Sequence, residues 1–191
     1  MKIYDTPEGV DKYFEMSDGY DLSRYKDLIL QYLPQGKTLL EIGMGPGNDF
    51  AWLSQLYTVT GSDYSREFIG RAEKRFPGAD LQVLDGIKLN TDKVFDALFS
   101  SKVYQHINLE ELESSLNKQL KILSEDGLIL HSFWIGGSEM DFDDMHFFYH
   151  DREKLQKIIS KNFDILETDI YSEFEDSDSM FLIAQKKSWR K

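Results

Sequence analysis

Hydrophobic and polar positions along this chain follow helical spacing in some segments and strand-like runs in others. Over residues 10–33, apolar side chains recur at helical spacing on both sides of Ser17-Asp18-Gly19, which predicts two amphipathic helices. From residue 37 onward, short runs rich in β-branched and aromatic residues alternate with helical patterns. We expect strands at 37–42, 57–63, 81–84, 94–99 and 127–133, with helices near 48–56, 65–75 and 109–123.

The end of the chain has a different pattern. After a helix at about 151–160, two apolar runs at 163–170 and 180–185 are separated by a polar turn and by no helix, which is typical of a hairpin. The acidic turn at 173–178 is expected to be solvated. Alternating strands and helices predict a parallel sheet joined by right-handed crossovers. The chain is therefore expected to have an α/β fold that ends in a hairpin.

Composition narrows the function. A chain of 191 residues, 41% of them hydrophobic, suits one packed domain, and the lack of cysteine excludes a thiolate nucleophile, a disulfide scaffold and cysteine-ligated metals. The net charge of -12 disfavours nucleic acid, and no basic stripe large enough to reverse it is evident; the basic tail at 186–191 is interpreted as a solvated end. No leader pattern or bilayer-length apolar run is seen, so we expect a cytoplasmic protein without a membrane partner.

A glycine-rich turn carries the candidate chemistry. Residues 40–47 read Leu-Glu-Ile-Gly-Met-Gly-Pro-Gly, so that an apolar strand runs into three closely spaced glycines and then into a helix. Glycines at such a turn allow a sharp bend and let a ligand approach bare main chain. Structural turns use the same residues, so this spacing by itself is a weak signal.

Two acids at later strand ends strengthen the prediction. Asp63 ends the second strand, where a carboxylate can accept both hydroxyls of a ribose, and Asp85-Gly86 ends the third. A carboxylate and an amide at that place would lie beside an adenine amine. Each acid alone is explained as a helix cap or turn acid. Because the carboxyl ends of parallel strands meet at one sheet edge, the two together predict an adenosine site.

With the segment 41–47, Asp63 and Asp85, residues 36–187 resemble the class I, Rossmann-like S-adenosylmethionine-dependent methyltransferases of the small-molecule type. The resemblance implies a doubly wound seven-stranded sheet of order 3-2-1-4-5-7-6, with strand 7 antiparallel and helices on both faces. It implies S-adenosylmethionine as cofactor and S-adenosylhomocysteine as product. We expect a single domain over 1–191, in which residues 1–35 form a helical cover and residues 36–187 the core.

The resemblance also assigns roles to residues at the strand ends. It places the cofactor against Glu41, Gly43, Gly45, Gly47, Asp63, Tyr64, Asp85, Gly86, Ser100 and Ser101. In this set the glycines and serines flank the methionine part, Asp63 takes the ribose, and Tyr64, Asp85 and Gly86 face the adenine. Glu41 would orient the turn or accept a hydrogen bond from the methionine amine.

The acceptor side is less clearly marked. A sulfonium methyl is already activated, but an oxygen or protonated nitrogen acceptor must lose a proton, so His106 is the first candidate base and Tyr104 the second. The alternative for His106 is capping or packing against the helix that starts near Asn108. Residues expected to bind a small-molecule acceptor, whose reacting atom (O, N or S) is undetermined, are Tyr13, Tyr20, Trp134, His146 and Tyr149.

Three other interpretations remain. A dinucleotide-dependent oxidoreductase also uses glycines after its first strand and an acid after its second, but its glycine spacing differs and it needs a substrate domain. A non-catalytic S-adenosylmethionine-binding sensor keeps the same cofactor site. The acids at 141–144 with His146 and His150 could be drawn as a metal site, but their spacing fits no template and we expect no metal.

Overall fold

The computed structural model describes residue 4 and residues 6–142 and 145–188, and its centre is a seven-stranded sheet of order β3-β2-β1-β4-β5-β9-β8. The strands are β1 (Thr38–Ile42), β2 (Thr58–Asp63), β3 (Asp80–Val83), β4 (Phe95–Ser100), β5 (Leu123–Trp134), β8 (Phe163–Tyr171) and β9 (Ser179–Lys186). Neighbours from β3 to β5 are parallel, whereas β9 is antiparallel to both β5 and β8. The predicted strand order and the antiparallel last strand are therefore confirmed.

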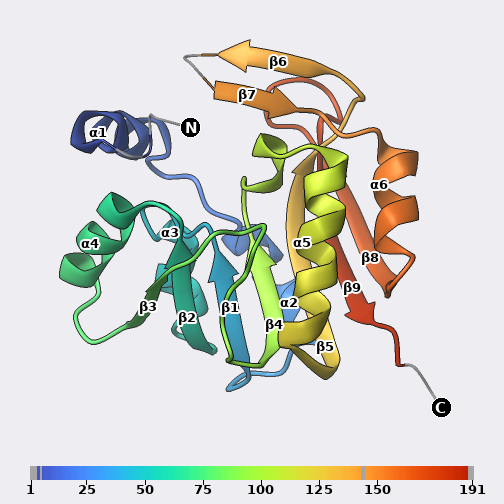
Figure 1. The fold of residues 1–191 in the computed structure, drawn as a ribbon, viewed down its shortest axis with the longest axis horizontal. Helices are drawn as coiled ribbons and strands as arrows, with labels where there is room; N and C mark the ends of the chain where they lie inside the picture. Colours follow the sequence, from blue (N-terminus) through green and yellow to red (C-terminus); the bar gives the residue numbers. More distant parts are fainter. Residues whose placement is uncertain (1–3, 5, 143–144, 189–191) are drawn as a thin grey trace.

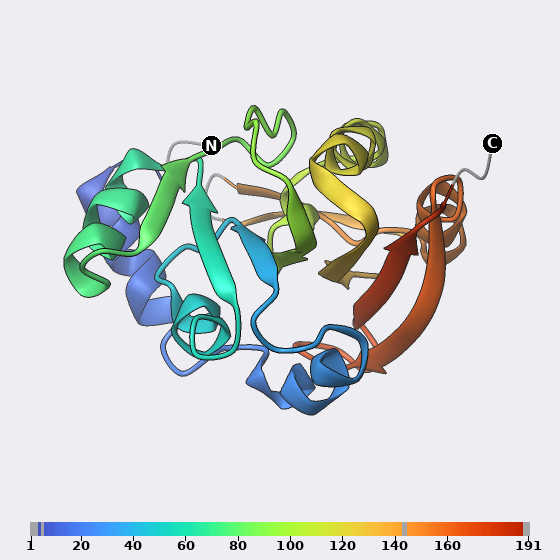
Figure 2. The ribbon, with the colours of Figure 1, turned by 90° about the horizontal axis from the view of Figure 1, so that it is seen from below.

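Helices cover both faces of this sheet (Figures 1 and 2). They are α1 (Pro7–Met16), α2 (Lys26–Tyr32), α3 (Asn48–Leu53), α4 (Arg66–Arg75), α5 (Leu109–Ile122) and α6 (Arg152–Ile159), with 3-10 turns η2 (Ser23–Tyr25) and η3 (Tyr104–His106). One buried cluster joins the sheet to α5 and α6, and a second joins it to α2, α3 and α4. Strand β1 supplies both, because Leu40 faces the first cluster and Leu39 the second, as the alternation of side chains along a strand requires.

Local sequence sets several element boundaries. Asn108 and Glu111 form a reciprocal capping box at the start of α5, and Ser65 caps α4. The expected helix over 48–56 ends earlier, at Leu53. Strand β5 begins at Leu123 rather than near residue 127, because Phe95 of β4 already pairs with Leu123 and the ladder shifts register before Ala97. The polar residues that follow Leu123 do not have the apolar pattern of a strand, so the sequence did not indicate this early start.

A small second sheet stands at the carboxyl edge of the main one. It consists of β6 (Glu139–Phe142) and the antiparallel β7 (Met145–Phe148), which the sequence interpretation did not predict as strands. Met145 and Phe147 are buried and join Val10 of α1 and Trp134 of β5 in a third cluster. Figure 1 shows α1 and this sheet above the ends of the central strands. Helix α1 and the β6–β7 sheet therefore cover the carboxyl edge of the main sheet from two sides.

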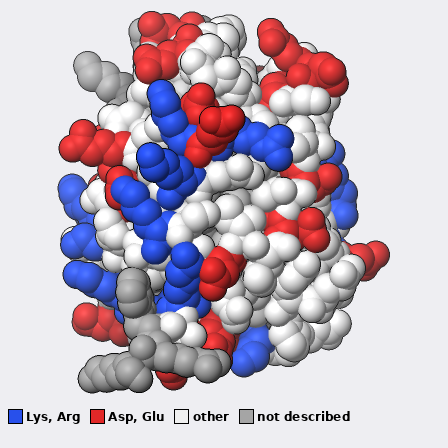
Figure 3. Space-filling view, turned by 90° about the vertical axis from the view of Figure 1, so that its right-hand side faces the viewer, with Lys and Arg blue, Asp and Glu red and all other residues white. Residues whose placement is uncertain are grey.

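Charged side chains are unevenly distributed on the surface. Figure 3 shows Lys and Arg gathered in a column on the face that carries α6 and β8. Acidic side chains stand beside the basic ones along this column. Among the described residues, no helix combines the length and the apolar character needed to cross a bilayer.

Candidate cofactor and acceptor cavity

The glycine turn after β1 requires its glycines. Gly43 and Gly47 have φ of +69° and +82°, a left-handed conformation that side chains disfavour. A Cβ at Gly43 would collide with Val103, and one at Gly47 would lie 2.6 Å from the ring of Phe76. In register, Ile42 pairs with Ser62 of β2 and with Ser100 of β4, so the ends of these three strands coincide beside the turn.

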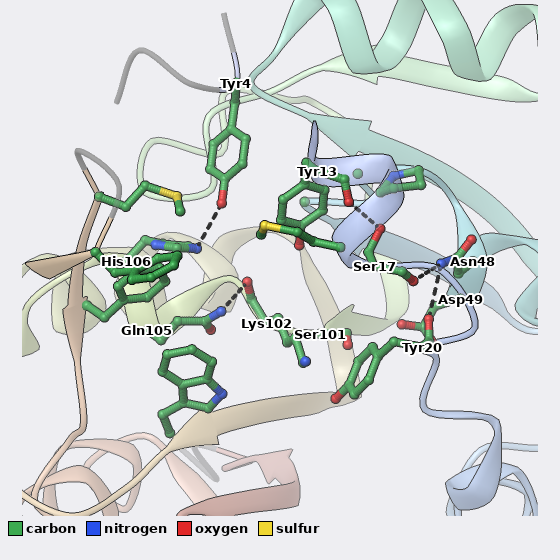
Figure 4. Close-up of a pocket in the computed structure, with 18 of the residues that line it drawn as sticks. Tyr4, Tyr13, Ser17, Tyr20, Asn48, Asp49, Ser101, Lys102, Gln105 and His106 are labelled. Atoms are coloured by element: carbon green, nitrogen blue, oxygen red, sulfur yellow. Dashed lines mark hydrogen bonds between the residues drawn. The ribbon is translucent and has the colours of Figure 1, made fainter. Parts of the chain in front are cut away.

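A cavity of about 600 Å³ opens beside this turn, between α1, η3 and the β6–β7 sheet (Figure 4). The predicted site residues that line it are Tyr13, Tyr20, Glu41, Gly43, Gly45, Ser101, His106, Trp134 and Tyr149. Those outside its lining are Gly47, Asp63, Tyr64, Asp85, Gly86, Ser100, Tyr104 and His146. The cavity thus brings the turn, the N-terminal tyrosines and the predicted acceptor residues together, while the acids at the ends of β2 and β3 lie outside it.

Asp63 lies behind the glycine turn and is only 5% exposed. One carboxylate oxygen accepts from the Gly45 amide and the other from the Ser65 amide, each at 2.9 Å. Burial raises the pKa of Asp63 to about 6, although its backbone hydrogen bonds oppose that rise. The side chain therefore ties the end of β2 to the turn and keeps unused lone pairs.

Asp85 has a different environment. Its side chain is 43% exposed, one oxygen accepts from the amides of Ile87 and Lys88, and the other lies 3.5 Å from the Lys88 ammonium. The Gly86 carbonyl accepts from the Ser115 hydroxyl. The two acids thus differ in environment, because Asp63 is buried and holds the glycine turn, whereas Asp85 is partly exposed and holds a surface turn.

Two further carboxylates are buried at the cavity. Glu41 is 2% exposed, and its Oε2 has no hydrogen-bond partner in the described part of the chain. Burial, reinforced by Asp49 and Asp63, raises the pKa of Glu41 well above its ordinary value. Asp49 accepts from the Leu22 amide and from the Trp52 indole, and its pKa is also raised by burial. Asp49 was not predicted as a site residue, although its position in the first turn of α3, directly after the glycines, could have indicated it.

Tyr104 does not reach the cavity, which corrects its assignment as a candidate base. Its ring is fully buried and stacks on Phe133, and its hydroxyl lies 2.8 Å from the amide nitrogen of Gln119, which donates to it. Burial raises the pKa of Tyr104, so the phenol stays protonated. Ser100 is also buried, with its hydroxyl 2.9 Å from Nδ1 of His131. Both residues belong to the core beneath the site.

His106, in contrast, lines the cavity. Its Nε2 lies 3.4 Å from the Tyr4 hydroxyl, and its buried Nδ1 makes no hydrogen bond of ordinary geometry within the described residues. Burial lowers its pKa to about 4, so the imidazole is neutral at pH 7. It does not cap α5, since Asn108 does; instead its ring packs on Phe147.

An aromatic stack forms one wall of the cavity. The ring of Trp134 lies nearly parallel to those of Phe147 and Tyr149, with centroids 5.2 and 5.1 Å away, and Phe174 meets it edge-on. His146 is not part of this wall, which corrects its assignment as an acceptor-binding residue. It alternates with Phe147 along β7 and therefore points outward, where it pairs with Asp141 and Glu139.

Lys102, which follows β4 and lines the cavity, forms an ion pair with Glu173. Lys102 has the unusual φ of +55°, and its ammonium lies 3.1 Å from Glu173 and 3.4 Å from the centroid of the Tyr20 ring. Glu173 also accepts from Tyr20 and Trp134. The turn at 173–178 was expected to be solvated, but Glu173 is a buried centre of hydrogen bonds.

No group of three potential metal ligands occurs among the residues that the structure describes. Asp143 and Asp144, which belong to the acidic segment considered as a metal site, lie outside those residues.

Comparison with known proteins agrees with the resemblance to methyltransferases that the sequence motifs indicated. Residues 39–127 match the family model described as a methyltransferase domain. An uncharacterized methyltransferase of Alkaliphilus oremlandii is 32% identical over 104 residues, which are 53% of this chain and 47% of that protein. The match thus spans about half the length of this curated relative.

Solved structures extend the comparison to nearly the whole chain. The 1,6-didemethyltoxoflavin-N1-methyltransferase of Burkholderia thailandensis, solved with its acceptor and S-adenosylhomocysteine, has a TM-score of 0.75 at 16% identity and covers 92% of this chain and 82% of its own. An S-adenosylmethionine-dependent methyltransferase of Clostridium acetobutylicum has a TM-score of 0.76 at 14% identity, with coverage of 92% and 98%. Magnesium protoporphyrin IX methyltransferase of Synechocystis has a TM-score of 0.75 at 17% identity and covers 96% of both chains. These likenesses confirm the class I methyltransferase fold.

Proposed function

We propose that this chain is an S-adenosylmethionine-dependent methyltransferase that acts on a small-molecule acceptor. The observation that carries the proposal is the glycine turn at the rim of a cavity of about 600 Å³, anchored from behind by the buried carboxylate of Asp63. The methyltransferase-domain match over residues 39–127 and the sheet order support it. A dinucleotide-binding sheet of order 3-2-1-4-5-6 does not contain the inserted antiparallel strand β9, which argues against the oxidoreductase.

The residues at the strand ends fit the cofactor. The unpartnered Oε2 of Glu41 lies beside the turn, where a methionine amine would supply the missing donor and stabilise the ionised carboxylate. Asp63 accepts backbone hydrogen bonds from Gly45 and Ser65, one on each oxygen, and we propose that its remaining lone-pair capacity serves the ribose. We propose that Gly43, Gly45, Gly47 and Ser101 flank the methionine part, with Ser100 in the core beneath them, and that the adenine lies toward Tyr64, Asp85 and Gly86, which are outside the cavity lining.

The chain's own residues supply positioning and proton transfer. The bound cofactor provides an activated sulfonium methyl, so the protein must align the acceptor with it and exclude water. Tyr13 of α1 and Tyr20, which follows α1, line the cavity together with residues of the β6–β7 sheet. His106 lines the cavity and is neutral at pH 7, so we propose that its imidazole takes a proton from an oxygen or nitrogen acceptor.

The proposal covers the chain as one domain, in which residues 1–35 cover the cofactor and residues 36–187 form the core. The size of the cavity supports a small acceptor in place of a nucleic acid, and the net charge of -12 is consistent with that. We propose that the reaction takes place in the cytoplasm.

Binding of S-adenosylhomocysteine, measured by calorimetry and thermal shift, tests the cofactor site. Asp63→Ala should weaken binding at least tenfold, because each hydrogen bond to a charged group contributes about 1.5–3 kcal/mol and about 1.4 kcal/mol is a factor of ten. Asp126→Ala, at an exposed position of β5 outside the cavity lining, serves as the matched control and should bind normally. Unchanged affinity in Asp63→Ala contradicts the site assignment.

Release of a labelled methyl group into a panel of phenols, amines, thiols and carboxylates tests turnover. Transfer to any of these compounds supports the enzyme. Tight cofactor binding with no transfer to any of them would favour the non-catalytic sensor.

A further inference from the structure

The small sheet of β6 and β7 has one polar and one apolar face, because side chains alternate between the two faces along each strand. On the polar face, His146 pairs with Glu139 and Asp141. The other face, which we call the inner face, consists of apolar side chains that line the cavity and form two cross-strand pairs: Met140–Phe147 and Phe142–Met145. The inner face is therefore an apolar surface that forms part of the cavity.

The described part of the chain covers only half of the inner face. Met145 and Phe147 of β7 are buried in the third cluster, beside Trp134. Met140 and Phe142 of β6 are 42% and 54% exposed, although they line the same cavity. Apolar residues that stand alone on a surface are ordinary, but several together indicate a binding surface. The β6 half of the inner face therefore presents such a surface.

Two more exposed apolar side chains lie at the mouth of this cavity. Met16, the last residue of α1, is 51% exposed, and Phe174, between β8 and β9, is 68% exposed; both line the cavity. Methionine side chains are flexible and polarisable, so they adapt to apolar ligands of varied shape. The cavity lining contains four of the six methionines of the chain: Met16, Met44, Met140 and Met145. The cavity is thus suited to an apolar group that extends to its mouth.

The inner face lies on the side of the cavity away from the proposed cofactor site. Figure 4 shows His106 on one side of the cavity and Asn48 and Asp49 on the other. Asn48 and Asp49 begin α3, directly after the glycine turn, whereas the His106 ring packs on Phe147 of the inner face, with centroids 4.8 Å apart. The cofactor's charged and hydroxyl groups also need polar partners, which the inner face does not offer. The acceptor is the other molecule that the proposed reaction brings into the cavity, so it is the molecule that covers this face.

We infer that the methyl acceptor joins a hydroxyl or an amine to an apolar tail, and that the tail lies along the inner face towards the mouth of the cavity. The inference rests on the proposed function and makes Met140 and Phe142 specificity-determining residues. The methyl carbon leaves the sulfonium sulfur, which keeps the bonding electron pair and becomes a thioether. It bonds to the acceptor oxygen or nitrogen, whose proton passes to the imidazole of His106.

Homologous probes test this inference by calorimetry in the presence of S-adenosylhomocysteine. Para-ethylphenol and para-pentylphenol differ by three methylene groups, as do butylamine and heptylamine. Para-(methoxyethoxy)phenol and (methoxyethoxy)ethylamine match the long tails in length but carry ether oxygens. Each buried methylene raises affinity by about fourfold, the equivalent of about 0.8 kcal/mol. The wild-type chain should therefore bind each long apolar tail at least tenfold more tightly than its short homologue and its ether counterpart.

Substitutions on β6 test the surface itself. Met140→Ser and Phe142→Ser should each reduce the preference for the long apolar tail at least threefold, because they remove apolar area that the tail covers. The affinities for the short homologues and for S-adenosylhomocysteine should stay unchanged. Leu166→Ser, on β8 and outside the cavity lining, removes an apolar side chain of similar exposure and should keep the wild-type preference. The kcat/KM ratio of long to short homologue should follow the same pattern in every variant.

Several results would overturn the inference. They are equal binding of long and short homologues, equal binding of ether and apolar tails, and binding of S-adenosylhomocysteine without any probe. Loss of affinity for all probes by one factor in Met140→Ser would show that closure of the sheet, and no tail, covers the inner face. In sedimentation, a wild-type dimer that Phe142→Ser dissociates would assign that role to a second copy of the chain. Failure of S-adenosylhomocysteine itself to bind would instead overturn the proposed function.

Discussion

Two groups of buried polar side chains in this molecule differ in whether their polar atoms have hydrogen-bond partners. Beneath the cavity, Ser100, Tyr104 and His131 join Gln119 of α5 in a closed network. In the cavity wall, Gln105 and His106 leave an oxygen and a nitrogen unpaired. The turn η3 contributes to both groups, since its first residue points inward and the next two line the cavity. Paired polar groups hold the fold together, while unpaired ones add no such stabilisation.

The core network joins helix and sheet. The amide of Gln119 contacts the Tyr104 hydroxyl at 2.8 Å, the Ser115 hydroxyl at 3.1 Å and Nε2 of His131 at 3.0 Å. Ser115 in turn donates to the Gly86 carbonyl, at the edge of the proposed adenine site. Burial lowers the pKa of His131 to about 3, so this imidazole is neutral throughout the physiological range. The network therefore works as a neutral structural element.

The largest expected effect concerns His106. If it removes the acceptor's proton, His106→Ala should lower kcat by about 10²–10⁴-fold, the usual contribution of a positioned base. The affinity for S-adenosylhomocysteine should change little, because Glu41 and Asp63 are untouched. Steady-state kinetics with calorimetry separates the two quantities. His146→Ala, which removes an exposed imidazole of β7, is the control and should retain full kcat; an equal loss in both variants would refute the assignment.

The second prediction compares the two groups directly through stability. Gln119→Leu strands three buried partners, so we expect the free energy of unfolding to fall by about 3 kcal/mol, at roughly 1 kcal/mol for each lost bond. Gln105→Leu removes one bond to Lys102 and also the unpaired oxygen, so its loss should stay below about 1 kcal/mol. Urea denaturation measures both. Similar losses would show that the contrast between network and wall has no energetic basis.

The third prediction concerns pH and Asp63, whose pKa of about 6 lies above the ordinary value of about 3.9. The charged form accepts ribose hydroxyls best, so affinity for S-adenosylhomocysteine should decrease as pH falls through 6, by up to about tenfold per unit. The stability of the protein without ligand changes with pH in the opposite direction. Because the raised pKa favours the protonated form, the stability contribution of Asp63 is complete below about pH 4 and is lost as pH rises through 6. Calorimetry from pH 5 to 8 checks binding, and Asp63→Asn should flatten the profile.

The smallest effect is expected at Asp85. Its carboxylate is 43% exposed and already holds the amides of Ile87 and Lys88, so water competes for the oxygen that would face adenine. We expect Asp85→Ala to weaken S-adenosylhomocysteine binding by about two- to fivefold, or roughly 0.5–1 kcal/mol. A loss in calorimetry as large as that of Asp63→Ala would show that exposure does not distinguish the two acids.

Much of the cofactor side could be predicted from local sequence. Positive φ at Gly43 and Gly47 demands glycine, and the end of a β-branched run located Asp63 at the carboxyl edge. The acceptor side could be predicted only in part. Trp134 and Tyr149 line the cavity as expected, but His146 points away from it, although the alternation of burial along β7 was readable in the sequence. Glu173 was missed because an acidic turn gives no sign of the aromatic donors that fold onto it.

The amino-acid sequence by itself determined the alternation of strands and helices, the glycine turn and the acid that anchors it, because each depends on backbone preferences and periodicity within a few residues. Only the tertiary structure decided which of Tyr104, Gln105 and His106 belong to the core and which face the cavity. In a 3-10 turn, adjacent side chains point in different directions, and whether each finds a partner depends on α5, β5 and β7, which are distant in sequence. Hydrogen-bond satisfaction is a property of the assembled fold, so the division between core and cavity wall became recognisable only there.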